Sequence, residues 1–321
     1  MTANGALHSD LERLRQRAKR ALGDNEADQA VVKVRAIVGP GQIPASEADA
    51  QAAWNKLRDG DAPTATELQA LELVIRLLRP APLSVGGSLG DLPEQPGHNL
   101  YPPDLKDAWA TFRTTIKPLL YSVGRVDLKD GTHIGTGFLV ADGVLATNRH
   151  VLDDLTLGTG VLAPGRAQVL FQHEKATTDK PENIVPIEGV VRVHEHLDIA
   201  LLAVPTHGRP VVDIDTTGIQ EGHRVAAIGY PAKDEVRNPL FTAAVFRGDF
   251  GFKRASLGEV LDGTRTPSLF HDCSTLGGNS GSPVFSLETG RVVAIHRAGF
   301  FMYRNEAVDG ASLKPFTGTR D

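Results

Sequence analysis

A glycine-rich turn late in the chain places a serine where its hydroxyl could react. Residues 277–283 read GGNSGSP, so Ser280 stands between small residues that leave its side chain open to a substrate. Glycine at 278 permits a backbone that aims its own N–H and that of Ser280 at one point. Two such donors can stabilise a developing oxyanion in acyl transfer. Ser280 is the candidate nucleophile, and Gly278 with Ser280 the candidate oxyanion hole; the alternative is an ordinary Gly/Ser loop.

A serine hydroxyl needs a base that takes its proton, and two further residues could supply the required chemistry. His150 follows the β-rich run GVLATN where the chain leaves a predicted strand, which places it at a cleft. Asp198 opens the apolar run DIALLAV, where an acid is partly buried and needs a partner. A carboxylate that orients the imidazole would complete a triad. Taken singly, each also fits an ordinary loop histidine or a water-facing acid.

Many short strands are expected to position these side chains. From about residue 121 on, β-rich runs such as GTGFLVA, AQVLFQ and RVVAIH recur between turns, and no helix-length segments alternate with them. This pattern favours antiparallel barrels or sandwiches over a doubly wound α/β sheet. The glycines at 135 and 137 lie between predicted strands, where they would let neighbouring chains approach closely.

The N-terminal part of the chain has a different pattern. Residues 1–80 are predicted to form four short helices, among them an amphipathic stretch at 27–38 and a last helix opened by Thr64 or Thr66. Residues 81–103 are rich in Pro and Gly and predict an extended, poorly packed linker. We therefore expect a helical adaptor or regulatory domain at 1–80, a linker at 81–103 and a second domain at 104–321.

Composition and charge exclude several classes of protein. The 321 residues carry a formal net charge of -5, which opposes nucleic-acid binding. The single cysteine cannot form an internal disulfide, and neither a signal peptide nor a membrane span is apparent, so we expect a cytoplasmic protein. No metal, cofactor, nucleic acid or membrane partner is predicted. Although His194, His196 and Asp198 alternate along one stretch, solvated or structural histidines are the favoured interpretation.

Three short motifs together resemble the trypsin-like peptidase superfamily, in which the catalytic residues run His, Asp, Ser along the chain. The motifs TNRHV, DIALL and GGNSGSP occur here in that order. The resemblance covers about residues 118–315 and is closest to the bacterial glutamyl endopeptidase and high-temperature-requirement branches. It implies a mainly β fold of two antiparallel six-stranded β-barrels. An α/β-hydrolase is rejected, because it requires Gly at 282, where this chain has Ser, and a different residue order.

The resemblance also implies an activity and a role for each residue. The protein would be a serine endopeptidase that acts on a protein or peptide through an acyl-enzyme on Ser280. His150 would be the general base and acid, and Asp198 the orienting carboxylate. Asn279 stands where secreted zymogens have an aspartate, which argues against activation by a freed N-terminal amine. A pseudoprotease that only binds peptides and a self-cleaving protease are the alternatives.

A specificity pocket is implied at six positions, which are Ser274, Thr275, His296, Arg297, Ala298 and Gly299. Ser274 is uncharged, so a preference for Arg or Lys is not supported. Thr275 and His296 match the pair found in glutamyl endopeptidases, and both side chains can hydrogen-bond a Glu or Gln before the cut bond. His296 could equally be a satisfied strand histidine, and Arg297 replaces the small residue of many relatives. The helical part resembles, in architecture alone, the adaptor regions of bacterial effector proteases, which implies a regulatory partner at residues 1–80.

Overall fold

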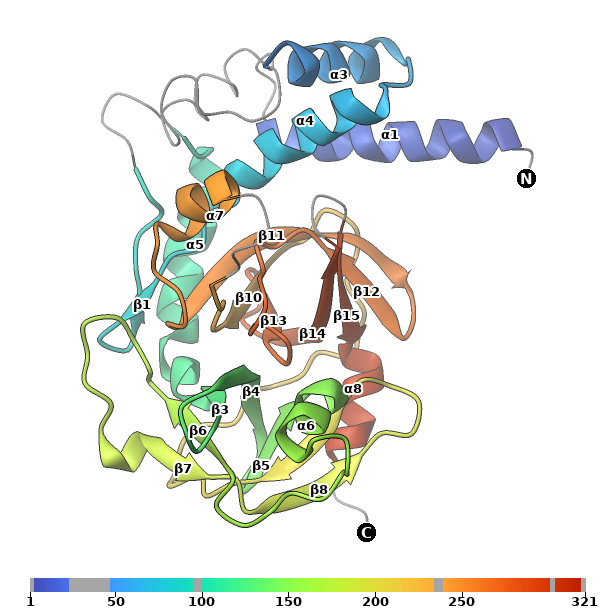
Figure 1. Ribbon diagram of the computed structural model, residues 1–321. Helices are drawn as coiled ribbons and strands as arrows, with labels where there is room; N and C mark the ends of the chain where they lie inside the picture. Colours follow the sequence, from blue (N-terminus) through green and yellow to red (C-terminus); the bar gives the residue numbers. More distant parts are fainter. Residues whose placement is uncertain (1–2, 23–46, 95–99, 234–238, 301–303, 319–321) are drawn as a thin grey trace. The chain divides into compact units, whose positions relative to one another are not determined.

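The chain is described by a computed structural model over residues 3–22, 47–94, 100–233, 239–300 and 304–318 (Figure 1). Two compact units share the chain. One comprises Met1–Pro80, Pro93–Lys106 and Val236–Gly248, and the other comprises Ala81–Leu92, Asp107–Glu235 and Asp249–Asp321. The units therefore interleave along the sequence and do not follow the three linear segments predicted above. The functional roles assigned to those segments stay predictions.

Helices make up the first unit. They are α1 (Ala3–Leu22), α3 (Glu47–Asp59), α4 (Ala65–Leu77), α7 (Pro239–Phe246) and the first residues of α5 (Pro103–Ile116). Thr64 caps α4: its hydroxyl accepts from the Glu67 N–H, and the Glu67 carboxylate accepts from the Thr64 N–H. This capping box confirms Thr64 as the predicted start. The predicted helix at 27–38 lies outside the described residues.

A buried carboxylate joins α1 to α4. Arg17 Nη2 donates to Glu72 Oε1 at 3.0 Å, and Arg76 Nε donates to the same oxygen at 2.7 Å. Removing one partner of a buried ion pair leaves uncompensated charge and costs about 3–5 kcal/mol. We expect Glu72→Ala to lower the free energy of unfolding by about this amount in urea titration. The exposed Glu12→Ala should cost less than about 1 kcal/mol, and equal losses would contradict the prediction.

Six antiparallel strands close a barrel in the second unit (Figure 1). In spatial order they are β10 (Arg224–Gly229), β11 (Arg254–Arg265), β12 (Ser268–His271), β15 (Arg304–Asp309), β14 (Val292–Phe300) and β13 (Pro283–Ser286). Small and β-branched side chains such as Val225, Ala227 and Val284 fill its centre, together with Cys273. This barrel confirms one half of the predicted fold.

Seven strands form the other sheet of this unit, and here the prediction of a second six-stranded barrel is wrong. Their order is β7 (Ile184–Pro186), β6 (Ala167–Phe171), β3 (Val123–Leu128), β4 (His133–Ala141), β5 (Val144–Thr147), β9 (Ala200–Ala203) and β8 (Gly189–Val193). The sheet curls into an open half-barrel, so that with its helices the fold is mixed and not purely β.

The open seam of the half-barrel follows from the path of the chain between β7 and β8. Ile187 donates its N–H to Ala167 at 3.1 Å on one side, and Glu188 donates to Ala203 at 2.8 Å on the other. Pro186, which ends β7, has no N–H to donate. The segment between β7 and β8 thus bonds first to β6 and then to β9. Within the described residues, no strand pairing joins β7 to β8.

Part of the predicted linker is packed structure. Residues 81–92 contain the hairpin β1 (Ser84–Val85) and β2 (Ser88–Leu89), whose Leu89 is buried. Ser84 donates its N–H to the Lys253 carbonyl at 2.9 Å, and its hydroxyl donates to Glu174 at 2.6 Å. The prolines and glycines that predicted an extended tether therefore surround a short hairpin attached to the β-rich unit.

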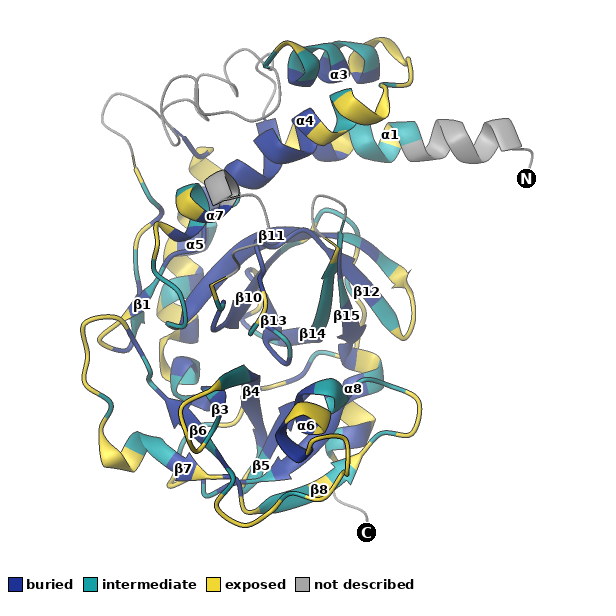
Figure 2. Cartoon of the chain, viewed as in Figure 1, coloured by how far each residue is buried: buried dark blue, intermediate teal, exposed yellow. Residues whose placement is uncertain are grey.

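Further helices complete the β-rich unit. They are the rest of α5, the 3₁₀ turns η1 (Lys117–Ser122) and η2 (Pro181–Asn183), and the helices α6 (Arg149–Thr156) and α8 (Gly310–Thr317). Figure 2 shows buried residues along the strands of both sheets and on the inner side of α6. Across the described segments, none of the helices combines the length and apolar character that a bilayer crossing requires.

Candidate active site

His150 and Asp198 are directly bonded. The Nδ1 atom of His150 lies 2.8 Å from Asp198 Oδ2, and the backbone N–H of His150 donates to Asp198 Oδ1 at 3.1 Å. His150 is the second residue of α6, just after β5, and Asp198 stands two residues before β9. Strands β5 and β9 are neighbours in the half-barrel, so the ladder between them brings the two residues together. One carboxylate therefore fixes both the ring and the backbone of the histidine.

Residues beside the pair hold the loop that carries Asp198. Asn148 Nδ2 donates to the Asp198 carbonyl at 2.8 Å, and Arg149 Nη2 donates to the Glu195 carbonyl at 3.0 Å. His194 Nδ1 accepts the N–H of Leu197 at 3.1 Å, so this histidine serves the turn itself. That role agrees with the structural interpretation preferred over a metal site.

Ser280 lies on a turn held between the two sheets. Its carbonyl accepts the N–H of Thr136 on β4 at 2.8 Å, while the N–H of the next residue, Gly281, donates to the His296 carbonyl on β14 at 2.9 Å. Gly281 has φ +87°, and an added Cβ would lie 2.1 Å from the Thr136 carbonyl oxygen. The turn therefore requires glycine after the serine, and it fixes Ser280 against β4.

Helix α6 and the turn that carries Ser280 both contact Gly135 on β4. A Cβ built on this residue would lie 2.8 Å from a methyl group of Val151 and 3.0 Å from the carbonyl oxygen of Ser280. Val151 directly follows His150, so the helix that carries the base and the turn that carries the hydroxyl contact the same glycine. The predicted close approach of chains at 135 is confirmed, although Gly135 lies within β4 and not between strands as predicted.

The carbonyl groups that precede Gly278 and Ser280 in the chain are both hydrogen-bonded. The Gly277 carbonyl accepts from the Ala232 N–H at 2.6 Å, and the Asn279 carbonyl accepts from the Ser282 N–H at 2.9 Å. In a trans peptide the following N–H points away from the carbonyl, so the N–H groups of Gly278 and Ser280 point away from these partners. Among the described parts of the chain, neither of these two N–H groups donates to a backbone carbonyl.

Gly278 rests on side chains that the sequence did not single out. Its φ is +82°, and an added Cβ would lie 2.5 Å from both His133 Cε1 and the Tyr230 carbonyl oxygen. Its own carbonyl accepts from the Thr136 hydroxyl at 2.8 Å, and that hydroxyl accepts from the Tyr230 N–H at 3.3 Å. Burial lowers the pKa of His133 to about 4, so this imidazole is neutral where it packs on the turn.

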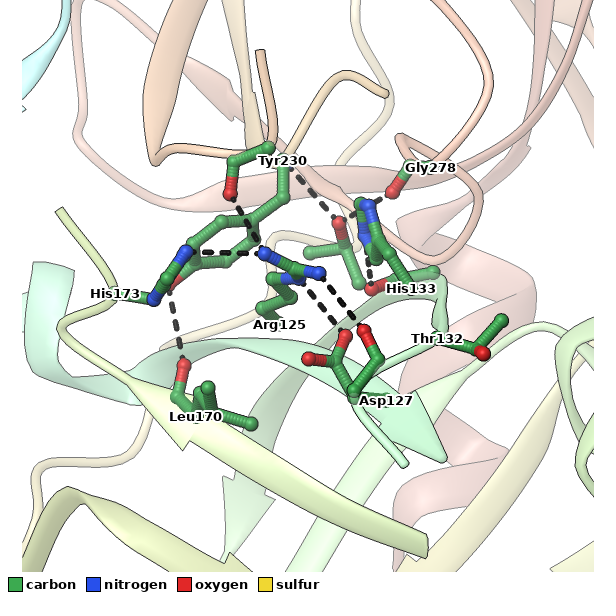
Figure 3. Close-up of polar contacts among 12 residues, drawn as sticks. Arg125, Asp127, Thr132, His133, Leu170, His173, Tyr230 and Gly278 are labelled. Carbon is green, nitrogen blue, oxygen red and sulfur yellow. Dashed lines mark hydrogen bonds and ion pairs between the residues drawn. The ribbon is translucent and has the colours of Figure 1, made fainter. Parts of the chain in front are cut away.

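A cluster of polar side chains lies next to Tyr230 (Figure 3). Arg125 donates to Asp127 at 2.8 Å and lies 3.0 Å from Nε2 of His173, whose Nδ1 lies 2.8 Å from Asp179. The rings of His173 and Tyr230 are in contact, with centroids 6.5 Å apart. No pattern at short spacing points to these residues, because they come from β3, the segment after β6 and the segment after β10.

The electrostatics suit a base that works with a permanent anion. Burial alone would lower the pKa of His150, but the hydrogen bond and negative charge of Asp198 outweigh it, so the pKa is raised. Burial would raise the pKa of Asp198, but the same bond and the positive charge of the imidazolium lower it. Asp198 therefore stays ionised while His150 titrates.

The raised pKa of His150 predicts the acid side of a pH profile. Only the neutral imidazole can accept a proton, and a raised pKa keeps the ring protonated to higher pH. The kcat/KM for a peptide should therefore fall on acidification with a midpoint above about 6.5, the ordinary value for histidine. Initial rates between pH 5 and 9 would measure it, and a midpoint at or below that value would contradict this account.

The predicted pocket residues lie on two segments of the closed barrel. Ser274 and Thr275 are buried in the segment after β12, and His296 is buried on β14. Thr275 and His296 are each bonded to a side chain that sequence reasoning missed, Asn305 and His271. Ala298 and Gly299 continue β14 beyond the bulge, pairing with Glu306 and Asn305 on β15 respectively.

Arg297 occupies the bulge in β14 and is engaged by an acid. Its Nη2 donates to Glu306 Oε2 at 2.5 Å, and Arg304 donates to the other oxygen at 3.2 Å. Arg297 is also close enough to Asp198 for its charge to help lower the pKa of that carboxyl. Asn279, which precedes the serine, is fully buried and donates from Nδ2 to the Leu276 carbonyl at 3.4 Å.

Known proteins with related sequences were compared with the chain. Glutamyl endopeptidase of Staphylococcus aureus strain MRSA252 is 25% identical over 234 residues, which cover 70% of this chain and 59% of that protein. The enzyme of strain MW2 is 24% identical over 225 residues, with 67% and 62% covered. The chain thus spans about three fifths of the length of these relatives. A solved serine endoprotease from Yersinia pestis is 19% identical, with a TM-score of 0.46 and 64% of each chain covered.

A family model described as a trypsin-like peptidase domain matches residues 135–295, half of the chain. The matched region contains the His150–Asp198 pair, the Ser280 turn and most of both sheets. It confirms the resemblance that the three ordered motifs carry. The chain belongs to the trypsin-like peptidase family.

Proposed function

We propose that the protein is a serine endopeptidase that hydrolyses peptide bonds through an acyl-enzyme on Ser280. The observation that carries this proposal is the bond between Asp198 and His150, together with the contact that the helix of His150 and the Ser280 turn both make with Gly135. A base oriented by a half-buried acid lies near a serine, and in the described residues neither the N–H of that serine nor that of Gly278 donates to a backbone carbonyl. Acyl transfer needs such an arrangement.

In the first half of the reaction, His150 takes the proton of the Ser280 hydroxyl as the oxygen attacks the scissile carbonyl. The resulting imidazolium is stabilised by the ionised Asp198, and the N–H groups of Gly278 and Ser280 hold the oxyanion. His150 then gives the proton to the leaving amine. In the second half, His150 activates a water molecule that hydrolyses the acyl-enzyme and restores the serine.

The proposed preference is for Glu or Gln before the cut bond. Thr275 and His296 offer a hydroxyl and an imidazole, and neither they nor Ser274 carries the negative charge that would select Arg or Lys. The name of the staphylococcal relatives, glutamyl endopeptidase, supports the acidic side chain of this pair. His296 lies close enough to His150 for the charge of that imidazole to help lower the pKa of His296.

A digest of a peptide library by the intact protein, compared with Ser280→Ala, tests activity and preference together. We expect cleavage after Glu or Gln with the intact protein and none with the variant. Cleavage that persists in the variant would reject Ser280 as the nucleophile. Cleavage after Arg or Lys would reject the pocket assignment.

We further propose that the helical segment 1–80 restrains the peptidase or recruits a regulatory protein. Support comes from its place in a compact unit distinct from the β-rich one, and from its own buried Arg17–Glu72 pair. A protein shortened to begin at Ala81 keeps the hairpin contacts to Lys253 and Glu174. A higher kcat/KM than that of the full chain would support restraint, and equal values would dismiss it.

The cytoplasm is the proposed location. The single cysteine is buried in the barrel core, where it behaves as a small apolar group and makes no disulfide. Immunoblotting of cell fractions from the source organism would test this proposal, and recovery outside the cytoplasmic fraction would reject it.

A further inference from the structure

Two buried histidines form a hydrogen-bonded chain that ends at the proposed pocket. The backbone N–H of Cys273 donates to His271 Nδ1 at 3.3 Å, so this nitrogen is an acceptor and the ring proton sits on Nε2. His271 Nε2 lies 3.1 Å from His296 Nδ1 and donates to it. His296 Nδ1 is therefore also an acceptor. Its own proton must be on Nε2, the nitrogen left for a substrate.

The surroundings keep His296 neutral. Burial is the main cause that lowers its pKa well below the ordinary value, and the nearby imidazoles of His271 and His150 lower it further. The two guanidinium groups nearby, those of Arg297 and Arg304, share the carboxylate of Glu306. The pocket thus presents an N–H donor at His296 and no unshared positive charge from these groups.

The hydroxyl of Thr275 is held as an acceptor, whereas His296 is held as a donor. Asn305 Nδ2 donates to the Cys273 carbonyl at 2.6 Å, which sets the orientation of this amide. Asn305 Oδ1 is then an acceptor, and the Thr275 hydroxyl donates its proton to it at 3.1 Å. Because a hydroxyl has a single proton, Thr275 can offer only oxygen lone pairs to a substrate.

Gly299 leaves the Thr275 oxygen open. A Cβ on this glycine would lie 2.9 Å from Asn305 Oδ1 and 3.6 Å from Thr275 Oγ1, so any side chain there would cover the hydroxyl. Residue 299 pairs with Asn305 on β15, three positions after His296 on β14. The donor on β14 and the acceptor bonded to Asn305 on β15 are therefore held by two neighbouring strands.

We propose that this fixed donor and acceptor pair selects the primary carboxamide of Gln over the carboxylate of Glu. The amide oxygen accepts from His296 Nε2–H, and the amide NH₂ donates to Thr275 Oγ1. A carboxylate has only acceptors, so its second oxygen would face the lone pairs of Thr275. The inference rests on the proposed function in one respect, which is that these two side chains line the pocket.

Binding to the Ser280→Ala protein tests this without relying on catalysis. Two decapeptides that differ only in Gln or Glu at the position before the scissile bond would be titrated by calorimetry. We expect the Gln peptide to bind tighter by about tenfold or more, as for sites that leave a polar group mispaired. Equal binding, or tighter binding of the Glu peptide, would overturn the proposal.

A matched pair of variants locates the effect. Thr275→Val keeps the shape and removes the acceptor, so the Gln-to-Glu affinity ratio should fall about tenfold. Thr275→Ser restores the hydroxyl and should restore the ratio. A ratio that Thr275→Val leaves unchanged would overturn the role of Thr275.

Imidazole ¹⁵N–¹H spectra of the Ser280→Ala protein give an independent reading should Thr275→Val fail to fold. We expect both His271 and His296 to carry the proton on Nε2. A proton on Nδ1 of His296, or a charged ring at neutral pH, would overturn the proposal. Failure of the intact protein to cleave any peptide, with these spectra and the Gln preference intact, would instead reject the proposed endopeptidase activity alone.

Discussion

Replacing Ser280 with alanine should lower kcat for peptide hydrolysis by about a million-fold, the loss typical of a serine nucleophile. The acyl-enzyme cannot form without the hydroxyl, and the oxyanion donors and bound substrate would supply only residual catalysis. Stopped assays with a fluorogenic peptide would measure the ratio. The turn itself should persist, because its carbonyl and N–H contacts to Thr136 and His296 are made by the backbone.

Ser282 provides the matched control, since it lies in the same turn and is buried. Its hydroxyl lies 3.5 Å from Asn279 Oδ1, and its backbone is held by β14. Ser282→Ala should keep kcat within about tenfold of the intact protein. A loss at 282 as large as that at 280 would mean that the turn, and not the Ser280 hydroxyl, carries the activity.

Asp198→Asn should reduce kcat by about ten-thousand-fold, as for other triads in which the acid becomes an amide. The carboxylate accepts from His150 Nδ1–H, which leaves the lone pair of the imidazole on Nε2. An amide NH₂ in its place would donate to Nδ1 and leave Nε2 protonated, so the ring could no longer act as a base. The loss should be in kcat with little change in folding.

A variant of Asp153 distinguishes the effect of the hydrogen-bonded carboxylate of Asp198 from the effect of nearby negative charge alone. It lies exposed on α6, and its charge also raises the pKa of His150, although less than Asp198 does. Asp153→Asn should change kcat by less than about tenfold. Similar losses for both variants would show that long-range charge, and not the oriented hydrogen bond, is what matters.

The residues of the candidate site were predictable because each has a local signature. His150 follows a β-run and Asp198 precedes one, while Ser280 stands between Gly278 and Gly281, which both have positive φ. The ladder between β5 and β9 brings the first two together, as antiparallel strands of this kind must. Their roles as catalytic groups remain predictions that the variants above test.

Features that depend on distant contacts were not predictable. His133, Tyr230 and Gly278 meet across more than one element, and no local spacing links them. His271 on β12 and Asn305 on the neighbouring strand β15 hydrogen-bond the two pocket residues that the family likeness indicated. Such pairings follow from strand register across the closed barrel and leave no periodic trace in the sequence.

In the architecture, too, local patterns were predictable and features set by distant contacts were not. Short β-rich runs predicted the closed barrel, but whether the other sheet closes depends on how residues 184–193 pass from one edge to the other. Likewise, the Pro and Gly content of residues 81–103 is compatible with both a tether and a hairpin. The hairpin is set by contacts of Ser84 with Lys253 and Glu174, which are far away in the sequence.

Fluorophosphonate labelling followed by mass spectrometry tests the central claim most directly, since it requires an activated serine and no knowledge of the substrate. The intact protein should acquire a single adduct on Ser280, and His150→Ala should acquire it at least about a thousand-fold more slowly. An intact protein that remains unlabelled, or that carries the adduct on another residue, would contradict the account.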